Sequence, residues 1–168
     1  MKFFFIIFYA SLTLGAENVL QGSLKPSSDS LIEINSEYVN HLRPLLNASK
    51  ISDESKLFLY FWATWCPDCR DKLTHGTLVD LQKEFPKISV ITVNSDSDEM
   101  RGKTFSENEK IGLPVFRDEE KSLTKSLKIF ALPSWAILEK SSEGKWIVRM
   151  HSTGSDLADI RSELNKMF

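Results

Sequence analysis

The chain has 168 residues, a length that suits one globular domain. Its 21 basic and 23 acidic residues nearly cancel to a net charge of −2, and they are spread along the sequence without a basic stripe. This balance argues against a nucleic-acid partner, because nucleic-acid-binding domains carry a concentrated positive surface. Apolar residues make up 42% of the chain, which is enough for an ordinary core. We therefore expect a monomeric globular protein with mixed charges on its surface.

Residues 1–16 are typical of a secretory signal peptide. Lys2 supplies a positive charge, an apolar run extends from Phe3 to Leu14, and the small residues Gly15 and Ala16 offer a cleavage site. The run is short for a membrane span, which needs about 20 residues; an uncleaved membrane anchor is the alternative. Residues 17–30 are polar and are interpreted as a tether. Export puts the protein in the periplasm or elsewhere outside the cytoplasm, where disulfides persist.

Residues 31–168 alternate between strand and helix patterns and are predicted to form one domain. Strands are expected at 31–35, 57–62, 88–94, 134–139 and 146–150, with a short extended piece at 114–117. Helices are expected at 36–43, from the cysteine pair to about Phe85 with a bend near Gly76, near 103–110, after the capping residue Asp118, and from Gly154 onward. This order predicts an α/β fold with a central mixed β-sheet flanked by helices.

The two cysteines of the chain, Cys66 and Cys69, follow an apolar run of strand length that begins at Leu57. A Cys-x-x-Cys pair at a helix start suits dithiol redox chemistry, because free N–H groups and the helix dipole stabilise a thiolate. Cys66 is then the exposed nucleophile, and Cys69 is the resolving thiol that breaks the mixed disulfide formed on Cys66. Pro67 suits the first helical position, and Pro67 and Asp68 are expected to tune the redox poise of the pair.

Other neighbours of the pair have separate expected roles. The Asp68 carboxylate opposes thiolate formation, whereas the Arg70 guanidinium favours it. Trp65 is expected in a rim that contacts peptides beside the nucleophile. Trp62 belongs to a strand that is apolar on both faces and is expected in the core.

The segment from Phe61 to Arg70 resembles the active-site segment of thioredoxin-fold proteins and is most similar to the exported TlpA/ResA-like branch. A second similarity is Ala131-Leu132-Pro133-Ser134, which precedes a predicted strand. By this resemblance, Pro133 is a cis-proline that faces the dithiol, and Leu132 offers backbone groups to a bound peptide. The resemblance extends over roughly residues 30–168. It implies a thioredoxin-like fold and a thiol–disulfide oxidoreductase that acts on protein thiols and disulfides.

The resemblance further implies a reductant that a membrane thiol-transfer partner recharges, with apocytochrome c or another misoxidised protein as client. An oxidase or an isomerase stays open. No cofactor is implied beyond the redox-active disulfide Cys66–Cys69. Two positions depart from the family pattern: Tyr60 stands where thioredoxins carry a buried Asp, and Lys72 stands where the branch often carries a Glu. The acid that usually moves a proton for the buried thiol is therefore absent from both positions.

The cysteine pair has four other possible roles: a structural disulfide, a metal site, a peroxidase nucleophile and a copper-binding pair. A structural disulfide is disfavoured, because the closed loop is tiny and adds little chain-entropy stabilisation. No metal site is predicted, because structural zinc needs four ligands and His41, His75 and His151 show no paired spacing. A peroxidase is disfavoured, because its nucleophile normally follows a Pro and a Thr in a different local pattern. A copper-binding or copper-chaperone module that uses the same cysteines is the main non-enzymatic alternative.

Overall fold

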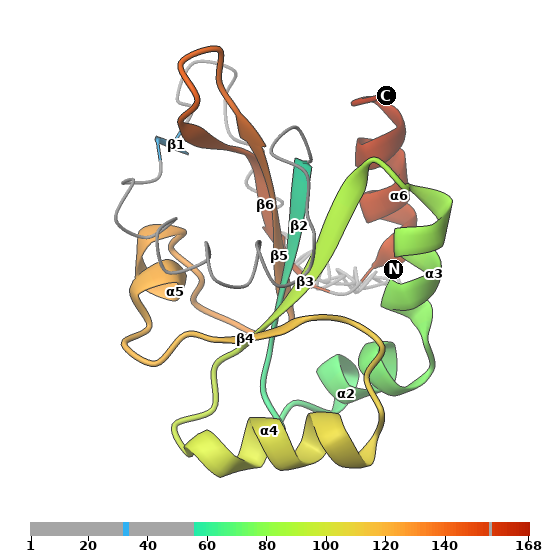
Figure 1. Ribbon diagram of the computed structural model, residues 1–168, viewed down its shortest axis with the longest axis vertical. Helices are drawn as coiled ribbons and strands as arrows, with labels where there is room; N and C mark the ends of the chain where they lie inside the picture. The colour runs from blue at the N-terminus through green and yellow to red at the C-terminus, as the bar shows by residue number, and fades with distance from the viewer. Residues whose placement is uncertain (1–31, 34–55, 155) are drawn as a thin grey trace, which may run out of the picture.

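The computed structural model describes residues 32–33, 56–154 and 156–168. Within these residues the chain forms a six-stranded mixed sheet with the order β1-β6-β5-β2-β3-β4 (Figure 1). The strand bounds are β1 Ile32–Glu33, β2 Lys56–Trp62, β3 Ile88–Asn94, β4 Val115–Arg117, β5 Ser134–Lys140 and β6 Trp146–Thr153. Strands β2, β3 and β4 are parallel to one another, whereas β5 is antiparallel to both β2 and β6, and β1 is antiparallel to β6.

Helices cover both faces of this sheet. The described helices are α2 Pro67–Thr74, α3 Thr77–Glu84, α4 Glu99–Asn108, α5 Ser122–Ser126 and α6 Leu157–Asn165. Figure 1 shows α3 and α6 on one side of the sheet, α5 on the other, and α4 along its lower end close to α2. None of the helices in the described ranges is long and apolar enough to cross a membrane. The predicted signal peptide, tether and first helix lie outside the described residues.

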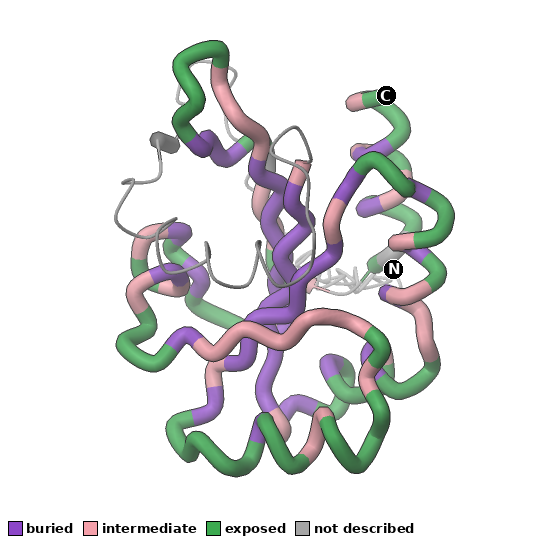
Figure 2. Tube along the Cα trace, in the orientation of Figure 1, coloured by how far each residue is buried: buried purple, intermediate pink, exposed green. Residues whose placement is uncertain are grey.

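Strand β2 lies at the centre of the sheet because both of its faces are apolar. Its odd-numbered residues from Leu57 to Phe61 pack into a core shared with α5, and its even-numbered residues from Phe58 to Trp62 pack into a core shared with α2, α3 and α6. All of them are fully buried, which Figure 2 shows as the continuous purple trace of this strand. The predicted core position of Trp62 is therefore confirmed, and the burial of both faces explains the unbroken apolar run.

The predicted strands agree closely with the observed ones. Strands β2, β3 and β5 match the predicted ranges within one residue, and β1 lies inside its predicted range. The extended piece at 114–117 is a true strand, β4, which pairs with β3 in parallel. Strand β6 continues to Thr153 rather than ending at Met150, because Thr153 pairs with Ser134 at the start of β5. A bulge between Ile137 and Leu138 adjusts the register of this hairpin.

The helices differ more from the prediction. Gly76 separates α2 from α3 with a left-handed φ of 70°, so the expected bend is a break between two helices. Helix α4 begins earlier than the predicted range near 103–110, because the Asp98 side chain caps it by accepting from the Met100 N–H at 2.9 Å. It also ends earlier, at Asn108.

The predicted capping role of Asp118 is confirmed, although Asp118 does not directly precede the helix. Lys121 precedes α5 in the chain. The buried Asp118 carboxylate nevertheless accepts from the backbone N–H groups of Leu123 at 3.1 Å and Thr124 at 2.8 Å. Asp118 therefore satisfies the free N–H groups of this helix from a more distant position.

Helix α4 approaches the end of β3 closely at Gly102, which is the buried residue of this helix. A Cβ atom at Gly102 would lie 2.4 Å from Oδ1 and 2.5 Å from Cγ of Asn94. Asn94 is itself 2% exposed, so its side chain has little room to move away. The absence of a side chain at Gly102 thus sets how near α4 lies to the sheet.

We predict that Gly102→Ala lowers the free energy of unfolding by about 1–3 kcal/mol, the usual effect of overpacking. Urea denaturation of the full chain measures this change. Gly112→Ala is the matched control, because its Cβ would lie 3.7 Å from the nearest Val79 atom, an ordinary contact. The two variants reduce the freedom of the unfolded chain alike, so equal effects would contradict the close packing at Gly102.

Candidate active site

The cysteine pair lies at the junction between strand β2 and helix α2. Cys66 is the N-cap of α2 with an extended backbone, and Pro67 occupies the first turn, as the sequence predicts. Cys66 and Cys69 form a disulfide with an S–S distance of 2.03 Å. The Cys66 Sγ also accepts a hydrogen bond from the Cys69 backbone N–H at 3.2 Å. A free N–H group of the helix start thus points at the sulfur, and it favours a thiolate there once the disulfide is reduced.

The prediction that Cys66 is exposed is wrong for this disulfide form. Cys66 is 5% exposed and Cys69 is fully buried. Both cysteines pack into the core cluster that includes Leu73, Leu78 and Trp135. The physical reason is that the sulfur of Cys66 points toward Cys69 and the core, whereas the neighbouring side chains point toward solvent.

Those neighbours surround the buried pair with exposed surface. Trp65 is 64% exposed, and Pro67, Asp68 and Arg70 are exposed as well. The exposure of Trp65 fits a rim that contacts peptides, and this contact stays a prediction. The tuning of the redox poise by Pro67 and Asp68 also stays a prediction.

Leu132 and Pro133, from a distant part of the sequence, lie near the segment that leads to the dithiol. The peptide bond between them is cis. Ser134 pairs with Phe61, so Pro133 lies beside the chain that leaves β2 toward the cysteines. Leu132 packs against the core cluster that contains both cysteines. The structure therefore brings together the two segments that the resemblance singles out, while their contact with a bound peptide stays a prediction.

Tyr60 and Lys72, the two residues that depart from the family pattern, do not supply the expected carboxylic acid. Burial, followed by the negative charges of Asp68 and Asp71, raises the pKa of the Tyr60 phenol above its ordinary range. Tyr60 is therefore neutral at physiological pH, and its hydroxyl has no hydrogen-bond partner among the described residues. The side chain of Lys72 is 27% exposed, and its Nζ lies 3.7 Å from the Asp71 carboxylate at the surface of α2.

A buried carboxylate that sequence reasoning missed fixes the loop before Cys66. Asp96, which follows β3, is 7% exposed. Its two oxygens accept from the Thr64 N–H at 3.0 and 3.2 Å, and one of them accepts from the Thr64 hydroxyl at 2.9 Å. The Asn94 amide donates to the same carboxylate at 2.8 Å. Because charged acceptors form stronger hydrogen bonds than neutral ones, Asp96 positions Thr64 firmly.

One sequence signal points to this residue. The carboxyl ends of parallel strands meet at the same edge of a sheet, and this edge is where α/β proteins place their sites. Strand β3, the parallel neighbour of β2, ends at Asn94, and the polar residues Ser95 and Asp96 directly follow it. They therefore belong beside the loop that carries Cys66. Asp96 is a positioning residue in this arrangement, because its described contacts are with Thr64 and Asn94 rather than with a sulfur atom.

No additional metal ligands accompany the cysteine pair within the described part of the chain. Groups of three or more His, Cys, Asp or Glu side chains that could hold a metal ion are absent there. The side chain of His75 is 72% exposed, and its Nδ1 lies 3.2 Å from the Asp71 carboxylate. His41 lies outside the described residues.

Comparisons with known proteins agree with this geometry. Residues 44–146 match the AhpC/TSA family. Thioredoxin-like protein YneN of Bacillus subtilis is 29% identical over 89 residues, which cover 51% of this chain and 51% of YneN. Thiol-disulfide oxidoreductase ResA of Halalkalibacterium halodurans is 24% identical over 98 residues, covering 58% of this chain and 54% of ResA. These matches thus span about half the length of the two curated relatives.

A solved structure confirms the fold. The crystal structure of StoA from Bacillus subtilis superposes with a TM-score of 0.54 at 23% identity, and the match covers 68% of this chain and 84% of StoA. The predicted α/β architecture with a central mixed sheet and a thioredoxin-like arrangement is confirmed. The resemblance to the ResA-like branch, seen first in the residues around Cys66, is confirmed by the match to ResA.

We predict that Asp96→Asn and Thr64→Val each lower the free energy of unfolding by about 1–3 kcal/mol, because each removes a hydrogen bond from this buried polar group of residues. The double variant should lose at least about 0.5 kcal/mol less than the sum of the single losses, because the residues contact each other. Urea denaturation of the four proteins completes this cycle.

The matched control is Asp98→Asn. Asp98 caps α4 at an exposed position, and Asn caps helices as well as Asp does. Its free energy of unfolding should therefore change by less than about 0.5 kcal/mol. Strictly additive losses in the cycle would show that Asp96 and Thr64 stabilise the fold independently.

Proposed function

The chain belongs to the AhpC/TSA family, and on this premise we propose that it catalyses thiol–disulfide exchange with protein substrates. The observation that carries the proposal is the Cys66–Cys69 disulfide at the start of α2, with the Cys69 N–H directed at the Cys66 sulfur at 3.2 Å. The relative named thiol-disulfide oxidoreductase supports it.

The proposed reaction starts from the reduced pair. The Cys66 thiolate attacks one sulfur of a client disulfide, a new S–S bond forms, and the other client sulfur leaves as a thiolate. Cys69 then loses its proton and attacks the Cys66 sulfur, which breaks the mixed disulfide and releases the second client sulfur. The client gains two electrons, each client thiolate takes up a proton at neutral pH, and the Cys66–Cys69 disulfide is formed. The same steps run backwards when the pair is reduced again.

The two cysteines have different environments that suit these unequal roles. Cys66 caps α2 and receives the N–H group that favours its thiolate. Cys69 lies one turn inside the helix and is fully buried, so attack by a client at that sulfur is blocked. This asymmetry supports Cys66 as the sulfur that meets clients and Cys69 as the sulfur that releases them.

We further propose that the protein works outside the cytoplasm as a reductant. Support comes from the N-terminal sequence, in which Lys2 and the apolar run Phe3–Leu14 fit a signal peptide. In this proposal a membrane thiol-transfer partner restores the dithiol, and apocytochrome c or another misoxidised exported protein is the client. The protein acts as a monomer and needs no cofactor besides its disulfide.

A copper-binding module is the alternative function for the same pair. Its support is limited to the two cysteines, because the described residues add no further metal ligands near them. Two soft thiolates suit Cu(I), so direct titration separates this alternative from exchange activity.

We predict that Cys66→Ser reduces the rate of protein disulfide reduction to the background rate, because serine is not a thiolate nucleophile. Cys69→Ser should still attack but stop at the mixed disulfide, which non-reducing electrophoresis and mass spectrometry detect as a covalent adduct with the client. Undiminished reduction by Cys66→Ser would refute the proposed exchange. Stoichiometric Cu(I) binding by a chain that reduces no disulfide would favour the copper-binding alternative.

A second prediction concerns the direction of exchange. The reduction potential of the Cys66–Cys69 pair is expected near the value of about −270 mV that is typical of thioredoxin, rather than the value of about −120 mV that is typical of an oxidant. Equilibration in dithiothreitol buffers measures it, with the fluorescence of the neighbouring Trp65 as the signal. A reduction potential of about −120 mV would contradict the proposed role as a reductant and favour an oxidase. The proposal of thiol–disulfide exchange would still hold.

A further inference from the structure

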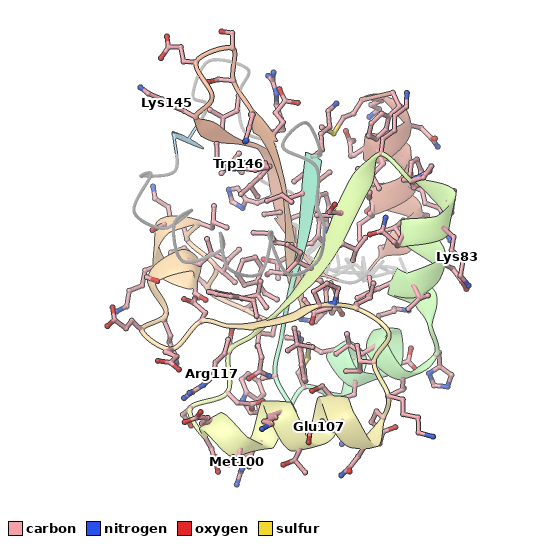
Figure 3. All side chains as sticks on the ribbon, in the orientation of Figure 1. Lys83, Met100, Glu107, Arg117, Lys145 and Trp146 are labelled. Atoms are coloured by element: carbon pink, nitrogen blue, oxygen red, sulfur yellow. A yellow bond between two sulfur atoms is a disulfide. The ribbon has the colours of Figure 1, made fainter. Side chains whose placement is uncertain are left out.

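An open cavity of about 400 Å³ lies beside the dithiol, between the active-site segment and helix α4. Thr64, in the loop before the cysteines, and Arg70, directly after them, line it on one side. Met100, Arg101 and Phe105 of α4 line it on the other. Figure 3 labels Met100 near the start of this helix.

A second cavity of about 360 Å³ continues from the first along α2. Arg70 and Phe105 line both cavities, so the two form one groove. Thr64 precedes Cys66 and lines the first cavity, whereas Pro67 follows Cys66 and lines the second. The groove therefore passes along the residues that flank the nucleophile on both sides.

The apolar part of this groove is anchored in the core. The Phe105 ring lies 5.5 Å from the ring of the buried Trp62 and packs against the cluster that contains both cysteines. Met100, by contrast, is 57% exposed. Met100 and Phe105 thus give this part of the groove an apolar surface.

Among the described residues, the charged side chains that line the first cavity are all positive. Its described lining includes two arginines and no carboxylate. Arg101 lies 3.7 Å from Asp98 at the start of α4. The guanidinium of Arg70 forms no ion pair or hydrogen bond within the described ranges. At least one cation beside the dithiol therefore has no counter-charge among the residues that the structure describes.

The acidic side chains of α4 contact cations outside this cavity. Glu99 lies 3.4 Å from Arg117, which follows from the approach of α4 to β4, and Glu107 lies 4.0 Å from Lys103. Neither lines the groove. Figure 3 shows Glu107 and Arg117 at separate places along this side of the molecule.

We propose that the first cavity binds an extended client segment that carries a carboxylate next to an apolar side chain, close to the client's reactive cysteine. Arg70 and Arg101 attract the carboxylate, and Phe105 and Met100 contact the apolar side chain. The second cavity, whose lining has both signs of charge, adds no charge preference. This inference rests on the proposed function, because the client's cysteine must reach Cys66.

The test uses the reduced full chain and short disulfide-bonded peptides that differ at one position beside the cysteine. The peptides carry Glu-Leu, Gln-Leu or Lys-Leu in that place. We expect kcat/KM for the Glu peptide to exceed that for the Lys peptide about 5-fold or more, as one or two partly exposed ion pairs allow. The ratio should fall at high salt, because exposed charges are screened.

The ratio of the two rates is also the readout for variants. Arg70→Gln combined with Arg101→Gln should bring the Glu-to-Lys ratio close to 1, even though loss of Arg70 also lowers the rate with every peptide by weakening the Cys66 thiolate. The matched control, Lys83→Gln combined with Lys103→Gln, removes the same charge from exposed positions outside the groove. Lys83 is labelled on α3 in Figure 3. The control should keep the original ratio.

Two results would overturn the inference while leaving the exchange activity intact. One is equal rates for the Glu and Lys peptides with the unchanged chain. The other is a preference that survives in the double arginine variant. Failure of the unchanged chain to reduce any of the three peptides would contradict the proposed function itself, so the two failures are distinguishable.

Discussion

The hydrogen bonds between the Asp96 carboxylate and Thr64 are the constraint on which the candidate site depends. They join the ends of β2 and β3, the two central parallel strands, at the point where the chain turns toward Cys66. A buried carboxylate is unfavourable unless several donors surround it, and here the loop itself supplies most of them. The loop and the carboxylate therefore require each other, and together they help to fix the position of Cys66.

The same constraint extends to helix α4 and to the groove. The Asn94 amide donates to Asp96, and Gly102 of α4 lies against the Asn94 side chain. A larger residue at Gly102 would move α4 outward and with it Phe105 and Met100, which form the apolar part of the groove. The shape of the surface beside the dithiol thus follows from packing at the end of β3, one layer below the surface.

The sequence predicts those features of the fold that local patterns determine. The apolar run before Cys66 predicts β2, the β-branched run from Ile88 predicts β3, and the Cys-Pro-x-Cys order predicts the helix start, because each depends on neighbouring residues only. The groove depends on how closely α4 approaches the sheet, so no local pattern indicates it. The polar residues at the end of β3 indicate Asp96 only once β3 is known to be the parallel neighbour of β2. The sequence predicts the start of α4 too late. The residues after Asp98 lack an apolar helical pattern, because the buried residue of this helix is Gly102. Cys66 was expected to be exposed because a nucleophile must react, yet its sulfur is covered while the disulfide is closed.

That coverage has a consequence for the lifetime of the disulfide form. Figure 2 shows the cysteine segment between the buried centre and the exposed surface of the molecule. With Cys66 at 5% exposure and Cys69 at none, a thiol in solution has little access to either sulfur, and the rate of exchange depends on that access. The disulfide form is therefore expected to exchange with thiols in solution more slowly than an exposed disulfide does.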